Sequence, residues 1–315
     1  MKYALPRAIV LAAFTFPLPA QTAAGISGVV APGVRPELVQ EGFTFTEGPV
    51  GTYDGGLFFS DIGAKRIYHM DPEGRITIAR GNTVGANGLA LNASELYAAE
   101  ASGKLISRGN QNGRVATVLE STDAAPLGSP NDIIFDSRGG FYFTDPGTAP
   151  LRPLDPNRHG KVYYVASNGG REPLLVDDKI AFPNGLTLTP DGKLLLVDDT
   201  LGDTIWAFDL QPKKSKNKAQ SGVARTAFAK IPEVKDGISG ADGMAVDRDG
   251  RVYVATDAGI QVFDKKGKHL GSIKVPRPPS NCAFSGPDKH TLYITAREGL
   301  YKLKMLSQGP DRAGK

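Results

Sequence analysis

Phe141-Tyr-Phe-Thr-Asp145 is one copy of a short phrase that recurs along the chain and decides its fold. Such a run of aromatic, aliphatic and β-branched residues is typical of a buried β-strand. The other copies are Leu57-Phe-Phe-Ser-Asp61, Leu96-Tyr-Ala-Ala-Glu100, Leu194-Leu-Leu-Val-Asp198, Val252-Tyr-Val-Ala-Thr256 and Leu292-Tyr-Ile-Thr-Ala296. Repeats of roughly 40–50 residues built from short strands are typical of propeller blades. The sequence therefore predicts a single all-β domain, a six-bladed β-propeller over residues 36–305.

Turn signals around these phrases support that prediction. Asp54-Gly-Gly, Pro190-Asp-Gly-Lys and Arg248-Asp-Gly-Arg each precede a copy, and such glycine-containing turns are typical of hairpins. No helical periodicity competes over the rest of the chain. A β-sandwich is the alternative fold, but it gives no reason to repeat the same phrase six times.

Composition bounds the class of protein. The chain has 315 residues, of which 40% are apolar and 22% charged, values that exclude a disordered chain or a polytopic membrane protein. Its net charge of +4 is small and evenly spread, so we expect no nucleic-acid partner. Cys282 is the single cysteine and cannot form an internal disulfide; we expect it to be a small buried hydrophobic residue. We also expect a monomer.

The first 24 residues read as a signal peptide. Lys2 and Arg7 precede an apolar run over residues 8–20, which is followed by the small residues Thr22-Ala-Ala24. The run is too short to span a bilayer, and no other run approaches that length. We expect cleavage after Ala20 or Ala24 and export to the periplasm or the medium. Residues 306–315 are expected to be a C-terminal tail.

A polar residue stands shortly before each phrase. The six are Glu47, Asn87, Asn131, Asn184, Asp242 and Asn281. Equivalent positions in propeller blades lie on a ring around the central channel, so these side chains are predicted to converge at one mouth. The alternative is an Asx turn at each strand start. That alternative accounts equally well for Asn87 and Asn281, but it does not account for Glu47.

The composition of this ring indicates a divalent cation. Its two carboxylates and several amides supply oxygen ligands only, with no cysteine or histidine. Such a set suits Ca²⁺ best, then Mg²⁺ or Mn²⁺, and suits Zn²⁺ least. The sequence therefore predicts a metal site at the central channel.

Several motifs resemble those of the gluconolactonase/regucalcin (senescence marker protein) family across nearly the whole of residues 36–305. They are Glu47-Gly-Pro49, Ser129-Pro-Asn-Asp132, Pro183-Asn-Gly-Leu186, Ala241-Asp-Gly-Met244 and the stretch 281–288. Residues 136–145 are also similar to calcium-dependent lactonases. The resemblance implies a six-bladed propeller with an axial divalent metal, often calcium, that hydrolyses sugar lactones and related esters.

By motif match, the resemblance implies that Glu47, Asn184 and Asp242 are metal ligands. Asn131 would be a fourth ligand or a substrate contact. The sequence departs from the family pattern at Ser129, where regucalcin-like members carry an arginine that holds a sugar acid.

These observations predict an exported, metal-dependent lactone hydrolase. The metal would polarise the lactone carbonyl and activate water, and Asp242 would handle the proton. Asp145, at the end of its strand, would contact the substrate or hold the structure, and the connections 146–159 and 231–240 would shape the mouth. The alternatives are a phosphotriesterase-type hydrolase at the same metal, with Asp242 as nucleophile or base, and a non-enzymatic calcium- or sugar-binding propeller.

Overall fold

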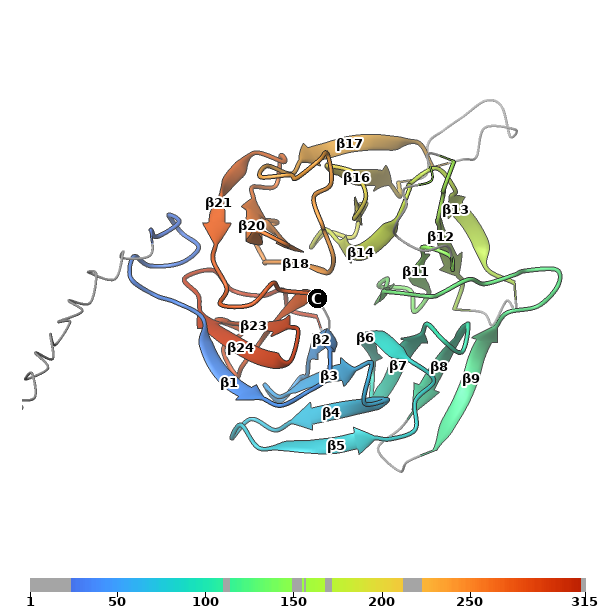
Figure 1. Ribbon diagram of the computed structural model, residues 1–315, viewed down its shortest axis with the longest axis horizontal. Coiled ribbons are helices and arrows are strands. Elements are labelled where there is room, and N and C mark those ends of the chain that lie inside the picture. Colours follow the sequence, from blue (N-terminus) through green and yellow to red (C-terminus); the bar gives the residue numbers. More distant parts are fainter. Residues whose placement is uncertain are drawn as a thin grey trace, which may run out of the picture.

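Six four-stranded antiparallel sheets surround a central axis in the computed structural model (Figure 1). The structure describes residues 24–109, 114–148, 155, 157–167, 172–211 and 223–312. Within those ranges there is no helix, and hence none that is long and apolar enough to cross a bilayer. The predicted six-bladed propeller is thus confirmed. Residues 1–23, which are all but the last residue of the predicted signal peptide, lie outside the described ranges, so the signal peptide and export stay predictions.

Each sheet runs from an innermost strand at the axis to an outermost strand at the rim. The first three sheets contain β2 (Thr46–Gly51), β3 (Leu57–Asp61), β4 (Arg66–Met70) and β5 (Ile76–Arg80); β6 (Ala86–Asn92), β7 (Glu95–Glu100), β8 (Leu105–Gly109) and β9 (Val115–Glu120); and β10 (Ile133–Phe135), β11 (Phe141–Asp145), β12 (Lys161–Val165) and β13 (Leu174–Asp177). The next two contain β14 (Pro183–Leu188), β15 (Leu194–Asp199), β16 (Thr204–Asp209) and β17 (Arg225–Lys230); and β18 (Met244–Val246), β19 (Val252–Thr256), β20 (Gly259–Phe263) and β21 (His269–Ile273). The six predicted phrases are the second strands of their sheets.

The sixth sheet closes the propeller with strands from both ends of the chain. It contains β22 (Asn281–Ser285), β23 (Thr291–Ala296), β24 (Gly299–Lys304) and, at the rim, β1 (Glu37–Glu41). β1 pairs antiparallel with β24, with Glu37 opposite Lys302 (Figure 1). Closing the ring in this way fixes the last sheet between its two neighbours and leaves no open end to the propeller.

Apolar side chains fill the spaces between neighbouring sheets. The innermost strands are almost wholly buried, whereas outermost strands such as β5 keep exposed positions. Among the largest fully buried side chains are Phe59, Phe143, Phe208, Tyr253 and Phe263. Cys282 is also fully buried, within the cluster shared by the fifth and sixth sheets, as the sequence predicts.

The repeat as read from the sequence is one residue out of register in the fourth sheet. Pro183 pairs with Asp199 across β14 and β15, just as Thr46 pairs with Asp61 in the first sheet. Asp199, and not Asp198, is therefore the counterpart of Asp61. β15 ends in two consecutive aspartates, which is why the sequence alone aligns the wrong one.

Segments on both sides of the predicted range 36–305 also pack against the propeller. Ile26, Val29 and Val30 are buried among side chains of the fifth and sixth sheets, and the amide of Leu306 donates to the carbonyl of Val29 at 2.8 Å. Residues 310–312 then line a cavity of about 620 Å³ together with the turns that follow the innermost strands. The tail therefore lies at the end of the channel opposite the starts of those strands.

The hydroxyl of Tyr253 ties this tail to the fifth sheet. It lies 2.9 Å from Oδ2 of Asp247 and 2.8 Å from Oγ of Ser307, and all three residues are buried. Burial raises the pKa of Tyr253, so the phenol stays protonated and acts as a donor.

Tyr253→Phe removes that donor and leaves two buried polar groups short of a partner. We expect the free energy of unfolding to fall by about 1–3 kcal/mol, measured by denaturant titration. Tyr53→Phe is the matched control, because Tyr53 is 67% exposed and its substitution should cost little. Equal stability of both variants would contradict the account of the tail.

Candidate functional site

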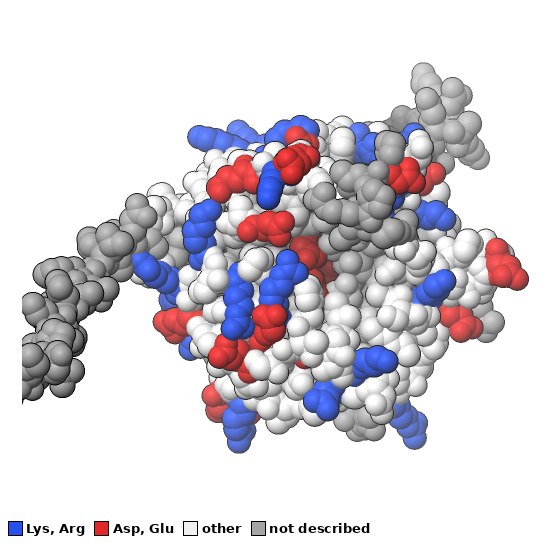
Figure 2. All heavy atoms as spheres, viewed as in Figure 1, with Lys and Arg blue, Asp and Glu red and all other residues white. Residues whose placement is uncertain are grey.

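The structure brings the six predicted polar residues together on one ring around the channel. Four lie within the first two residues of an innermost strand, and two lie two residues before one. The innermost strands are neighbours in sequence order around the axis, with β22 next to β2. We call these side chains the ring residues: Glu47, Asn87, Asn131, Asn184, Asp242 and Asn281. Figure 2 shows acidic atoms within the hollow at the middle of one face.

Glycines that follow the ring residues allow this close approach. A Cβ on Gly185 would lie 2.1 Å from the carbonyl oxygen of Asp242, and one on Gly243 would lie 1.8 Å from Cγ of Asn281. Both distances are far inside van der Waals contact, so the next sheet packs directly against bare main chain. The Asn-Gly and Asp-Gly pairs in the sequence therefore indicate close packing between neighbouring sheets at the ring, in addition to turns.

Hydroxyl groups in or just after the second strands donate to main-chain carbonyls at or beside ring residues of the next sheet. Oγ of Ser60 donates to the carbonyl of Asn87 at 2.7 Å, and Oγ1 of Thr144 donates to that of Asn184 at 2.6 Å. A similar, part-buried bond of 2.6 Å joins Thr200, directly after β15, to the carbonyl of Ala241, directly before the ring residue Asp242. These bonds cross from one sheet to the next, and so they hold the ring together as a unit.

β-Bulges aim the ring side chains at the axis. The pairing shifts register between Glu47 and Val50 in the first sheet, and again between Ala86 and Leu89 in the second. The fourth sheet shifts in the same way directly after Pro183. A bulge adds an unpaired residue and re-aims the side chains beside it.

Two carboxyl groups lie against each other in the ring. Burial raises the pKa of Asp242 well above its ordinary value, and the charge of Glu47, to which its carboxyl is hydrogen-bonded, raises it further. Glu47 is 3% exposed and also accepts a hydrogen bond from Nδ2 of Asn281 at 3.2 Å. Asp242 is half-buried. Two negative charges here need a proton or a cation between them.

The ring amides present oxygens to the same space. Nδ2 of Asn184 donates to Oγ1 of Thr200 at 3.0 Å, which turns Oδ1 away from Thr200. Oδ1 of Asn87 is buried and accepts no hydrogen bond from the residues that the structure describes. An unsatisfied buried oxygen is costly unless a ligand, an ion or water completes it. Asn281 differs, since its Oδ1 accepts the amide of Cys282 at 2.8 Å.

Two acidic residues beside the ring are not identified by the sequence reading. Asp132 is 1% exposed and accepts the amide of Leu186, while Asp198 is fully buried and accepts that of Gly185. Burial raises the pKa of Asp198 well above its usual range, and the charges of Asp242 and Asp132 add to that shift. Among the described residues, no three His, Cys, Asp or Glu side chains converge as a metal site. A cation at the ring would therefore rely on amide oxygens as well as on the two ring carboxylates.

Asp145 is held by main-chain hydrogen bonds. Its carboxylate accepts the amides of Gly128 and Ser129, both at 2.7 Å, and that of Gly147 at 3.0 Å. Asp61 accepts the amides of Thr44 and Phe45 at the equivalent place in the first sheet. Asp145 therefore positions the segment before Asn131, and its predicted contact with the substrate stays a prediction.

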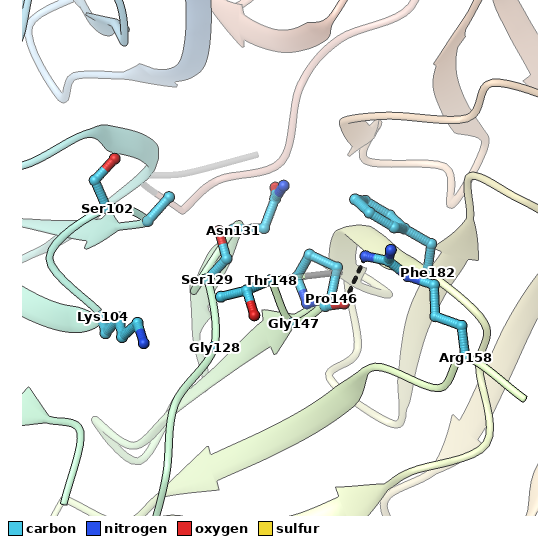
Figure 3. Close-up of a pocket in the computed structure, with 11 residues that line it drawn as sticks. Ser102, Lys104, Gly128, Ser129, Asn131, Pro146, Gly147, Thr148, Arg158 and Phe182 are labelled. Carbon is cyan, nitrogen blue, oxygen red and sulfur yellow. Dashed lines mark hydrogen bonds between the residues drawn. The ribbon is translucent and has the colours of Figure 1, made fainter. Parts of the chain in front are cut away.

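A cavity of about 480 Å³ opens beside the ring (Figure 3). Asn131 is a ring residue and also lines the cavity. The remaining walls are formed by the turn at 101–104, residues 128–129, residues 146–148, Arg158 and Phe182. A pocket of this size is typical of small-molecule sites. The predicted connection 146–159 therefore contributes to the mouth through the parts that the structure describes.

The arrangement defines a class of protein: a six-bladed propeller with an oxygen-lined polar ring at one end of its channel. The chain belongs to the SMP-30/Gluconolactonase/LRE-like family, whose family model matches residues 45–298. The predicted family is thereby confirmed.

Relatives and solved structures agree with that assignment. A gluconolactonase from Zymomonas mobilis is 26% identical over 298 residues, which cover 87% of this chain and 82% of that protein. The lactonase drp35 of Staphylococcus aureus is 35% identical over 149 residues, or 46% of this chain and 42% of that protein. A gluconolactonase structure from Xanthomonas campestris superposes with a TM-score of 0.76 at 27% identity, covering 90% of this chain and 94% of that one. Regucalcin from Agrobacterium tumefaciens, described as a calcium-binding protein, shares the fold with a TM-score of 0.72 at 20% identity, covering 88% and 95%.

Gly185→Ala tests the packing of the ring. The added methyl would collide with the Asp242 carbonyl, so we expect a loss of about 1–3 kcal/mol or more in the free energy of unfolding. Gly81→Ala is the control, because a Cβ on Gly81 meets no atom within 4 Å. Urea titration of both variants makes the comparison, and equal midpoints would show that the ring is not closely packed.

Proposed function

We propose that this protein is a lactone hydrolase that uses one divalent cation held by Glu47, Asn131, Asn184 and Asp242. The observation that carries the proposal is the pair of mutually repelling carboxyl groups, Glu47 and Asp242, set among amide oxygens at the ring. The gluconolactonase and lactonase relatives support the reaction class. The calcium-binding description of regucalcin supports the choice of a divalent cation.

The ring fits a cation in charge and in ligand type. A divalent ion would neutralise Glu47 and Asp242 and so remove the repulsion that raises the pKa of Asp242. The buried, unsatisfied Oδ1 of Asn87 adds a further oxygen to the same space. Oxygen-only sites of mixed carboxylates and amides favour Ca²⁺, so we propose Ca²⁺ ahead of Mg²⁺, Mn²⁺ and Zn²⁺.

Hydrolysis of a lactone adds water to the ester carbonyl carbon, breaks the ring C–O bond and returns a proton to the departing oxygen. A bound cation supplies positive charge that stabilises the oxyanion and favours the ionisation of water. Asp242 has the place and the chemistry to take the proton from water and to deliver it to the alkoxide. Glu47 and Asn184 hold their positions through hydrogen bonds to Asn281 and Thr200.

Asp242→Asn separates holding the cation from moving the proton. The variant keeps an oxygen at the ring and loses a carboxylate. If Asp242 is the base, lactone turnover at saturating Ca²⁺ should fall by roughly 100-fold or more, followed by acid release in a weakly buffered assay. Asn184→Asp is the control, since it adds a charge to the ring without moving the base, and it should bind Ca²⁺ more tightly.

The same assay, run with aryl esters and phosphotriesters and with or without chelator, tests the reaction class. Hydrolysis of phosphotriesters in preference to every lactone would overturn the proposal in favour of the phosphotriesterase alternative. Calcium binding with no hydrolysis of any substrate would indicate a binding protein. Full lactone turnover by Asp242→Asn would show that another group handles the proton.

A further inference from the structure

The cavity beside the ring has a chemistry of its own. Its described lining contains two cationic side chains, Lys104 and Arg158, and three hydroxyl groups, those of Ser102, Ser129 and Thr148. No aspartate or glutamate is among these lining residues. Cations and hydroxyl donors without an acid suit an oxyanion, whereas the acidic ring next to them suits a cation.

Arg158 is built into the wall of this cavity. Its side chain is only 7% exposed, and Nη2 donates to the carbonyl of Pro146 at 2.9 Å. The guanidinium also lies 4.7 Å from the centre of the Phe182 ring, an arrangement that fixes its plane. Figure 3 shows the guanidinium between Phe182 and Pro146. An arginine that is already positioned loses little rotamer freedom when it binds an anion.

The electrostatic setting of Arg158 favours a charged ligand. Burial lowers the pKa of Arg158, while the nearby charge of Asp155 acts in the opposite direction. An arginine remains protonated in either case, so the cavity carries a partly desolvated positive charge. Asp155 is exposed to solvent and does not line the cavity. An anion in the cavity would meet this charge at short range, where screening by water is weak.

Lys104 forms the facing wall. It follows the turn at the end of β7 and adopts a φ of +54°, which brings the turn around toward the cavity. Figure 3 shows its ammonium across the cavity from Arg158. Two cations on opposite walls, with hydroxyl groups between them, resemble a clamp for one oxyanion.

We propose that this cavity is a subsite for an oxyanion carried by the substrate, and that Arg158 determines the specificity for it. The inference rests on the proposed lactone hydrolysis at the ring. Asn131 belongs to both the ring and the cavity, so one ligand can place its ester at the ring and its anionic group beside Arg158. The substrate class is then a sugar lactone that bears a second acidic group, either a carboxylate or a phosphate.

Three lactones that differ only in that group provide the test: gluconolactone, a glucaric acid lactone and 6-phosphogluconolactone. We expect kcat/KM to be higher for one or both of the anionic lactones than for gluconolactone. In Arg158→Met, kcat/KM for the preferred anionic lactone should fall by roughly 10–100-fold, mainly through KM, because a charged hydrogen bond is lost. Gluconolactone turnover should fall much less, because its C6 hydroxyl is uncharged and forms only a neutral-acceptor hydrogen bond with Arg158.

Control variants separate recognition from folding. Arg158→Lys keeps the charge and should retain part of the preference, while Lys104→Met should weaken it less than Arg158→Met. Arg108→Met removes a cation from β8, where Arg108 pairs with Glu95, and should change none of the three substrates. An equal loss on gluconolactone and on the anionic lactones in Arg158→Met would show a structural role and overturn the proposal.

A binding experiment keeps the subsite testable if lactone hydrolysis itself fails. Glucarate and 6-phosphogluconate are titrated into the calcium-loaded protein by calorimetry, with gluconate as the reference. We expect tighter binding of the dianionic ligand that matches the preferred lactone, and loss of that difference in Arg158→Met. Hydrolysis of gluconolactone without any preference for an anion would refute the subsite and leave the proposed function intact. Anion binding at Arg158 without hydrolysis of any lactone would support the subsite and refute the proposed lactone hydrolysis.

Discussion

The carboxyl groups of Glu47 and Asp242 lie against each other at the ring, and the rest of the structure keeps them there. Isolated carboxylates would move apart or take up a proton, because burial and like charge both disfavour ionisation. Here the main chain gives them no freedom to separate. The main-chain carbonyl of Asp242 packs directly against Gly185. Glu47 accepts a hydrogen bond from Asn281, which belongs to the sheet that closes the ring. Closure of the propeller therefore keeps the two carboxyl groups next to each other. The pairing of β1 with β24 contributes to that closure.

Rigid and variable parts of the site have different origins. The ring is built from main chain of the innermost strands, fastened by hydroxyl groups such as that of Thr144. The cavity is built from connections between strands, which supply Lys104 and Arg158. A ring of this kind can keep one reaction type while the connections select the substrate. Asp145 joins the two parts, because it holds residues 128–129 in the cavity wall and lies at the end of a core strand.

The fold and most of the ring were predictable from the sequence because both repeat. Six copies of one phrase establish the number of sheets, and one polar residue before each phrase locates the ring. Non-repeating features were missed for physical reasons. Asp198 was aligned with Asp61 in place of the adjacent Asp199, and a one-residue slip in a strand exchanges its two faces, so the position of Asp198 beside the ring was missed. Arg158 lies in a connection with no counterpart in the other sheets. Its orientation depends on the ring of Phe182, which is distant in sequence, and on the main-chain carbonyl of Pro146, which any residue could supply.

Calorimetric titration of Ca²⁺ into the chelator-treated protein tests the central claim most directly. Because the pKa of Asp242 is raised, the metal-free ring holds its proton to higher pH than the unfolded chain does, and cation binding should displace that proton in this pH range. Titrations in two buffers of different ionisation enthalpy should show one ion per chain, release of protons on binding, and an affinity that rises with pH. Glu47→Gln should weaken this binding strongly. No binding of Ca²⁺, Mg²⁺, Mn²⁺ or Zn²⁺, or binding that is indifferent both to pH and to Glu47→Gln, would contradict the account.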